Sequence, residues 1–202
     1  MKQPTYEQFQ EDVKDHVLTV NLDNELYRDI TIKKPHSVDM HYHITTRPGY
    51  LMFTGDMGCY VFERTPDMFR FFRGCKINPY YWSEKLQAGK YQEYSPEMAR
   101  KALDNVFENW KECTDKDEEF IENEKSELDG IDTDNEFEFT SAVNDHYANE
   151  GGVDLTDFWE YNVKDYTYHY IWCCYAIVHA IDLYDQHKID LQDGHKEEVT
   201  HG

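Results

Sequence analysis

Residues 50–64, YLMFTGDMGCYVFER, carry the strongest structural signal in the chain. Two runs rich in aromatic and aliphatic residues, 50–54 and 59–64, flank the four residues Gly55-Asp56-Met57-Gly58. Glycine adopts the positive φ angles that tight hairpin turns need, and the flanking runs have the composition of strands. The stretch therefore predicts a β-hairpin.

Two more strands are predicted before this hairpin, over residues 28–33 (RDITIK) and 39–45 (DMHYHIT). Arg47-Pro48-Gly49 supplies the turn between the second of them and the hairpin, because proline and glycine favour turn conformations. Strands joined by such short connections pair in antiparallel fashion. We therefore expect a small antiparallel β-meander of three to four strands.

Elsewhere the apolar residues recur every three or four positions, which is typical of helices. The run at residues 170–178 is apolar nearly all round, so we expect the helix that contains it to lie in the centre of the core. The sequence predicts an α+β fold in which the β-meander packs with several helices. These helices are expected over residues 6–17, 66–73, 79–86, 96–113 and 164–187, with a short helical piece at 155–159. Ser95, followed by Pro96, is expected to cap the helix over residues 96–113.

A chain of 202 residues is long enough for one sizeable core. We expect a single domain over residues 1–189, with an acidic segment, residues 112–160, displayed on one side. Residues 190–202 are polar and contain no aromatic residue, so they are expected to form a mobile tail.

The negative charge of the chain is unevenly distributed. The formal net charge is −21, yet residues 1–105 hold 15 acidic and 14 basic residues. Residues 112–160 hold 18 acidic residues against only Lys116 and Lys125. A protein this acidic repels nucleic acid and anionic membranes and attracts basic partners. We therefore expect neither direct nucleic-acid binding nor membrane binding.

Apolar residues punctuate the acidic segment, so we expect it to be folded with its carboxylates facing outward. Such a surface can imitate a duplex, which carries about one charge per 1.7 Å of axis. Aromatic residues would supply the anchors that charge cannot. The predicted acidic contact residues are Asp115, Asp117, Glu118, Glu119, Glu122, Glu124, Glu127, Asp129, Asp132, Asp134, Glu136 and Glu138, and the predicted anchors are Phe120, Phe137, Tyr147 and Trp159.

Two other functions stay open at this point. Asp39, His41 and His43 alternate, so in a strand they would share one face and could hold the metal of a nuclease or nucleotide hydrolase. The chain also contains 16 Tyr, so it could be an interaction protein that acts through tyrosine-rich contacts while its charge serves only solubility.

No catalytic motif is apparent, because GxSxG, GxGxxG and a phosphate-binding loop are all absent. The five cysteines have no CxxC spacing, so we expect reduced, packed thiols of an intracellular protein. Residues 1–7 lack the apolar core of a secretion signal. We therefore expect a binding protein rather than an enzyme, acting without a metal or cofactor.

The runs RPGYL (residues 47–51), GDMGCYVFER (55–64) and DMFRFF (67–72) resemble a motif of uncharacterised proteins encoded by bacteriophages and prophages. The run IWCCYAIV (171–178) is similar to the usual ending of those proteins. The resemblance extends in order over most of residues 28–187, and about 30 residues carry it. It implies a phage origin but no specific activity, so it transfers no functional residue.

Small phage accessory proteins often disable bacterial defences, and acidic nucleic-acid mimics that inhibit CRISPR complexes or restriction enzymes recur among them. By this analogy we expect an anti-defence inhibitor of anti-CRISPR or anti-restriction type. Its partner would be a basic nucleic-acid-binding protein or complex, such as a CRISPR effector or a restriction system. Both would meet in the cytoplasm of the infected bacterial host.

Overall fold

The structure is a computed structural model that describes residues 2–74 and 76–200. Its contacts fall into two compact units. Unit 1 comprises Met1–Tyr91 and Tyr166–Gly202, and unit 2 comprises Gln92–Asp165. The sequence indicated one domain over residues 1–189; the contacts instead separate the part of the chain that contains the acidic segment.

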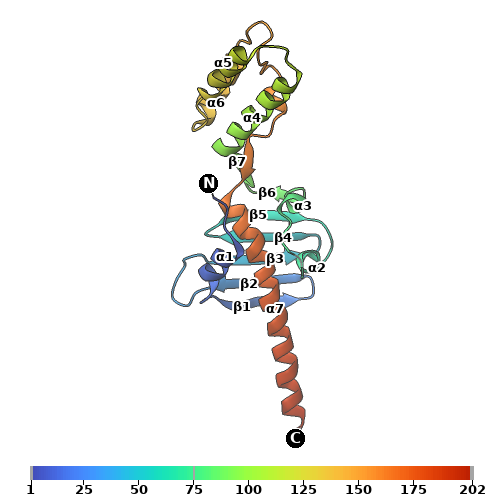
Figure 1. Ribbon diagram of the computed structural model, residues 1–202. Coiled ribbons are helices and arrows are strands. Elements are labelled where there is room, and N and C mark those ends of the chain that lie inside the picture. Colours follow the sequence, from blue (N-terminus) through green and yellow to red (C-terminus); the bar gives the residue numbers. More distant parts are fainter. Residues whose placement is uncertain (1, 75, 201–202) are drawn as a thin grey trace. The chain divides into compact units, whose positions relative to one another are not determined.

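Unit 1 is built on a six-stranded antiparallel sheet in which the strands follow one another in chain order (Figure 1). The α+β class is confirmed, but the expected three to four strands are too few. The two further strands are β1, whose Leu18, Val20 and Leu22 alternate with polar residues, and β6, which has only three residues. The strands are β1 (Val17–Asn24), β2 (Tyr27–Lys33), β3 (Tyr42–Arg47), β4 (Tyr50–Gly55), β5 (Gly58–Glu63) and β6 (Leu86–Ala88).

The predicted hairpin is confirmed as β4 and β5, in which Gly55 pairs with Gly58 across a two-residue turn. Their φ angles are 151° and 102°. A Cβ atom on Gly55 would lie 2.2 Å from the carbonyl oxygen of His41. Glycine is required at residue 55 because the neighbouring backbone leaves no room for a side chain.

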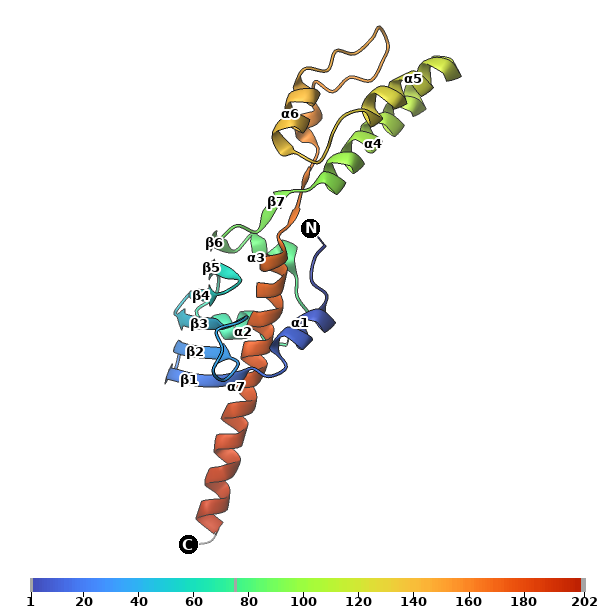
Figure 2. The ribbon, with the colours of Figure 1, turned by 90° about the vertical axis from the view of Figure 1, so that its left-hand side faces the viewer.

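Four helices of unit 1 lie on one side of the sheet (Figure 2). Thr5 caps the first of them in a capping box with Gln8. The prediction of a long apolar helix in the core is confirmed by α7. This helix extends through Thr200, so the segment expected as a mobile tail from residue 190 is helical as far as the structure describes it. Residues 201–202 of that predicted tail lie outside the described residues. These helices are α1 (Tyr6–Val13), α2 (Met68–Phe72), α3 (Pro79–Ser83) and α7 (Tyr168–Thr200).

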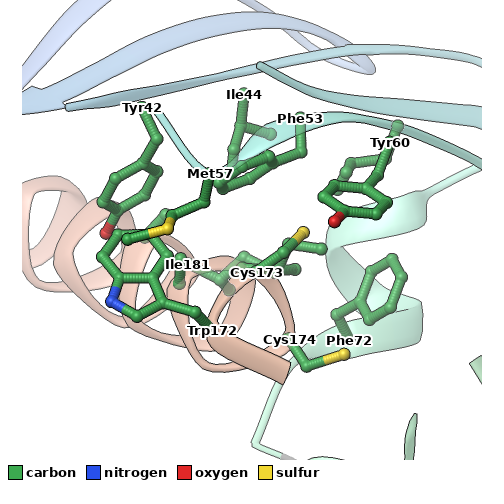
Figure 3. Close-up of a cluster of buried hydrophobic side chains, with 14 of the residues drawn as sticks. Tyr42, Ile44, Phe53, Met57, Tyr60, Phe72, Trp172, Cys173, Cys174 and Ile181 are labelled. Carbon is green, nitrogen blue, oxygen red and sulfur yellow. The ribbon is translucent and has the colours of Figure 1, made fainter. Parts of the chain in front are cut away.

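The core of unit 1 lies between the sheet and α7 (Figure 3). Tyr42 and Phe53 of the sheet are fully buried, and so is Trp172 of α7, whose ring meets Tyr42 edge-on at 5.5 Å. Cys173 and Cys174 are also fully buried, and burial raises the pKa of both thiols. Both residues therefore act as small packed side chains of the core.

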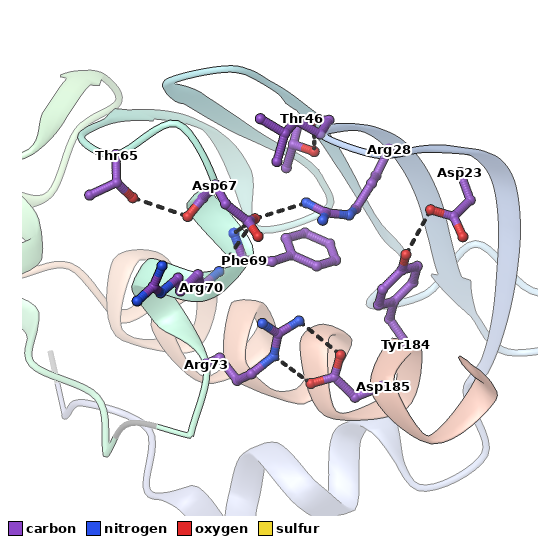
Figure 4. Close-up of polar contacts among 11 residues, drawn as sticks. Asp23, Arg28, Thr46, Thr65, Asp67, Phe69, Arg70, Arg73, Tyr184 and Asp185 are labelled. Atoms are coloured by element: carbon purple, nitrogen blue, oxygen red, sulfur yellow. Dashed lines mark hydrogen bonds and ion pairs between the residues drawn. The ribbon is translucent and has the colours of Figure 1, made fainter. Parts of the chain in front are cut away.

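A polar network holds α2 and α7 against the sheet (Figure 4). The guanidinium of the buried Arg28 donates to Asp67 at 2.9 Å and lies over the ring of Phe69. Asp67 also caps α2 by accepting backbone N–H groups. The exposed Arg73 forms a bidentate pair with Asp185 of α7.

Unit 2 consists of three helices, a short 3-10 turn and the paired strands β7 and β8. The predicted cap at Ser95 is confirmed, because its hydroxyl accepts the backbone N–H of Met98. A second apolar core, which includes Leu103, Phe107 and Leu128, holds the unit together. The elements are β7 (Gln92–Tyr94), α4 (Pro96–Cys113), α5 (Glu118–Asp129), α6 (Glu136–Asn144), η1 (Phe158–Glu160) and β8 (Lys164–Tyr166).

No helix among the described residues combines the length and apolar character needed to cross a membrane.

Candidate partner-binding surface

Most of the negative charge of the chain belongs to unit 2. Residues 92–165 hold 23 acidic and six basic residues, a net charge of −17, and the rest of the chain carries −4. The excess of acidic residues therefore coincides with one compact unit of the structure.

The exposed side of α5 carries a dense group of free carboxylates. Asp117 caps this helix by accepting the N–H of Phe120 at 3.0 Å. Glu118, Glu119 and Glu122 follow and are all exposed. Residues at positions i and i+4 lie on the same side of a helix, with i+1 about 100° further around it, and four residues span about 6 Å of the axis. The mean axial spacing of these three charges is thus about 3 Å, close to the roughly 3.4 Å between phosphates along one strand of a duplex.

Eight of the twelve predicted contact residues are exposed and make no side-chain hydrogen bond or ion pair within the described part of the chain. Carboxylates without an internal partner are available to an external cation. The eight are Asp115, Glu118, Glu119, Glu122, Glu127, Asp134, Glu136 and Glu138.

Glu124 is not a contact residue, although the sequence predicted it as one. It is only 2% exposed, and its carboxylate accepts Asn149 Nδ2 at 2.9 Å and the backbone N–H of Val153 at 2.8 Å. Gly152 packs so closely that a Cβ atom there would lie 2.7 Å from the carboxylate. Glu124 therefore fixes the loop at residues 149–153 onto α5.

The other three predicted carboxylates also have internal partners. Asp117 is the cap of α5 described above, and Asp132 accepts the backbone N–H of Asp134 at 2.7 Å. Asp129 lies 3.1 Å from Lys125 Nζ and 3.9 Å from Arg100. These three residues stabilise the unit locally, so they contribute less to an outward field than the eight free carboxylates do.

Three of the four predicted aromatic anchors are strongly exposed. Phe137 is 80%, Tyr147 90% and Trp159 78% exposed. Phe120 is half-buried instead, because it lies between the ring of Trp110 and the ammonium of Lys116. Each of the three presents a large aromatic surface that a partner could cover.

Unit 2 also contains a groove that the sequence did not predict. It lies between α6 and the segment around η1 and has a volume of about 160 Å³. Phe139, Val143 and Phe158 are buried and belong to the second core, whereas Trp159 is exposed at the groove. The sequence indicated only that Phe139 and Val143, four residues apart, share one side of a helix. The packing of α6 against η1 depends on tertiary contacts that no local pattern shows.

The alternative metal site is not assembled. Asp39 lies in a turn before β3, because Met40 has a positive φ of 53° and β3 begins only at Tyr42. Among the described residues no group of three or more potential ligands is positioned to hold a metal ion. His41 instead has Asp56 3.2 Å from its Nδ1 atom. The expectation that residue 39 shares a strand face with His41 and His43 is therefore wrong.

His43 takes part in a polar network on the helix-free face of the sheet. Its Nδ1 lies 2.9 Å from the hydroxyl of Thr31, and Asn21 donates to both Thr31 and Asp29. Burial, helped by His41, lowers the pKa of His43. The network ties the neighbouring strands β1, β2 and β3 together.

Comparison of the chain with protein-family models, curated proteins and solved structures finds no match.

Proposed function

We propose that unit 2 is an acidic decoy that occupies the nucleic-acid-binding groove of a basic protein or complex and thereby inhibits it. The supporting observation is the combination of free carboxylates and exposed aromatic rings on one unit. Glu118, Glu119 and Glu122 supply charge at nearly the axial spacing of the phosphates along one strand of a duplex. Lys and Arg side chains that bind phosphate oxygens would donate hydrogen bonds to these carboxylates in the same way.

Charge and aromatic contacts have different tasks in this proposal. The net charge of −17 on unit 2 accelerates the encounter with a basic groove and selects it over neutral surfaces. Burial of Phe137 or Trp159, which are both strongly exposed in the free chain, contributes affinity that salt does not screen.

The resemblance to phage and prophage proteins supports a biological setting for this inhibitor. We propose that it acts against a bacterial defence, of the CRISPR or restriction type, in the cytoplasm of the infected host. Such systems grip nucleic acid through basic channels, which are the surfaces that an acidic decoy fits.

An interaction surface made mainly of tyrosines has less support. Tyr42, Tyr60, Tyr170 and Tyr184 are buried in unit 1, so part of the tyrosine content serves the core. Tyr147 of unit 2 is strongly exposed, but it belongs to the same unit as the free carboxylates and fits the acidic surface equally well.

The proposal is tested by affinity capture of the tagged full chain from bacterial lysate at low and high salt. We expect one basic nucleic-acid-binding complex to be recovered at low salt, and to be released by added duplex DNA or by high salt. A partner that stays bound in high salt and in excess DNA would show that the surface does not imitate nucleic acid.

A further inference from the structure

The groove of unit 2 is shaped by residues whose positions the second core fixes. Phe158 meets Phe139 at a ring distance of 5.6 Å and stacks on Tyr161 at 5.5 Å. Val143 lines the groove from the next turn of α6, and Trp159 lines it while remaining 78% exposed. The groove is therefore preformed, and a partner that enters it need not reorganise its walls.

The size of the groove indicates what it can hold. Its volume of about 160 Å³ is well below the roughly 300–1,000 Å³ of pockets that enclose small organic ligands or cofactors. It suits one aliphatic or aromatic side chain. Tryptophan is among the residues that contribute most to protein interfaces, and Trp159 is the wall that such a side chain would cover.

The charge around the groove indicates what must flank that side chain. Residues 132–163, which supply nearly all of the groove, include nine acidic residues and neither Lys nor Arg. Thr140 also lines a second, open hollow together with Asp134, Glu136 and Phe137. An apolar side chain flanked by acidic residues would be repelled here. One flanked by Lys or Arg would be attracted by the carboxylates around the groove.

We propose that this groove, between α6 and η1, receives a single apolar side chain from a Lys/Arg-rich segment of the partner protein. The inference rests on the proposed function and adds a specificity element to it. The groove would make the decoy selective for basic proteins that carry an apolar residue within the basic segment. Phosphate-like charge brings the partner in, and the groove distinguishes one basic partner from another.

Two synthetic peptides test this inference on the full chain, namely Lys-Arg-Leu-Arg-Lys and Lys-Arg-Gly-Arg-Lys with blocked ends. Calorimetric titration at low salt is expected to show binding about tenfold tighter for the leucine peptide, from burial of one leucine side chain. Trp159→Ala should bring the two affinities together. Thr140→Trp, which fills the groove from an exposed position, should do the same.

The matched control is Tyr80→Ala, because Tyr80 is comparably exposed, at 71%, but belongs to unit 1 and lines neither hollow; it should preserve the tenfold difference. Equal, salt-sensitive affinities for the two peptides in the unaltered chain would overturn the groove inference and leave the acidic decoy standing. Absence of binding by both peptides would overturn the two together. A leucine preference that survives both Trp159→Ala and Thr140→Trp would also contradict the inference.

Discussion

Glu124 accepts the backbone N–H of Val153 at 2.8 Å, so a carboxylate from the middle of α5 holds the loop that passes over it. The same carboxylate accepts Asn149 Nδ2. In a unit with a net charge of −17, one glutamate is thus used for internal structure while its neighbours on the helix face outward. Burial and hydrogen bonding, rather than residue type, separate the structural carboxylates from those available to a partner.

The substitution Glu124→Ala should destabilise unit 2 by about 2 kcal/mol, because it leaves buried donors of the loop without an acceptor. Hydrogen exchange of the Val153 amide should accelerate accordingly. Glu127→Ala, on the exposed side of the same helix, is the control and should change exchange little. Equal effects of the two substitutions would show that the Glu124 contacts do not stabilise the loop.

Gly55→Ala should destabilise unit 1 by at least about 3 kcal/mol, because the new methyl group would collide with the backbone of His41. Gly49→Ala is a useful comparison: φ there is also positive, at +88°, but nothing lies within 4 Å of the added atom. It should cost only about 1 kcal/mol, from conformational strain alone. The measurement is hydrogen exchange of the β3 and β4 amides, and similar losses in both variants would refute the steric explanation.

Two ion pairs in unit 1 should differ strongly in their effect on stability. Asp67→Ala leaves the guanidinium of Arg28, whose side chain is only 10% exposed, without its carboxylate, and should cost about 3 kcal/mol. Asp185→Ala breaks the exposed pair with Arg73 and should cost less than about 1 kcal/mol. Thermal unfolding of both variants side by side checks the order, and the reverse order would contradict it.

The stability of unit 1 should fall in mildly acidic solution because of His179. Burial, with a smaller effect of His16, lowers its pKa from 6.5 to about 4. Burial also raises the pKa of Tyr42, so the tyrosine hydroxyl is the donor in its 2.8 Å contact with Nδ1 of the neutral imidazole. Below about pH 6.5 the unfolded chain binds a proton that the folded chain excludes, so the free energy of unfolding decreases as pH falls toward 4.

The total loss from this group is on the order of 3 kcal/mol across that pH window. Urea unfolding between pH 7 and pH 4.5, compared between the native chain and His179→Leu, isolates it from the titration of carboxylates. The variant should be less stable at pH 7, because Tyr42 loses its acceptor, but should depend less steeply on pH. Parallel pH profiles for the two chains would exclude His179 as the cause.

Local signals predicted the elements that depend on local chemistry. The hairpin around Gly55 and Gly58 followed from the need for positive φ, and α4 followed from the cap at Ser95 and its apolar repeat. β1 was not predicted, although its Leu18, Val20 and Leu22 alternate with polar residues as in a half-exposed strand. The predicted strand at residues 39–45 began too early, because nothing in the sequence announces the positive φ at Met40.

The candidate surface was predicted in composition but not in detail. Charge patterning located the acidic segment, and exposed aromatic residues such as Trp159 were expected at a contact surface. Helical spacing does carry a signal for Glu124, because it lies three residues after Ile121 and four before Leu128 and therefore shares the apolar side of α5. Its burial depends on the loop at residues 149–153, which lies 25 or more residues further along the chain.

The most direct measurement is displacement of fluorescent duplex DNA from the basic complex recovered by affinity capture. The native chain should release the DNA, and the triple substitution Glu118→Lys, Glu119→Lys and Glu122→Lys should weaken this competition by at least about a hundredfold, because three attractive charges become repulsive. The control carries the same change in net charge at Glu11, Glu25 and Glu84, which are exposed on unit 1, and should compete almost as well as the native chain. Undiminished displacement by the α5 variant, or equal losses in both variants, would contradict the proposal that the acidic surface of unit 2 takes the place of nucleic acid.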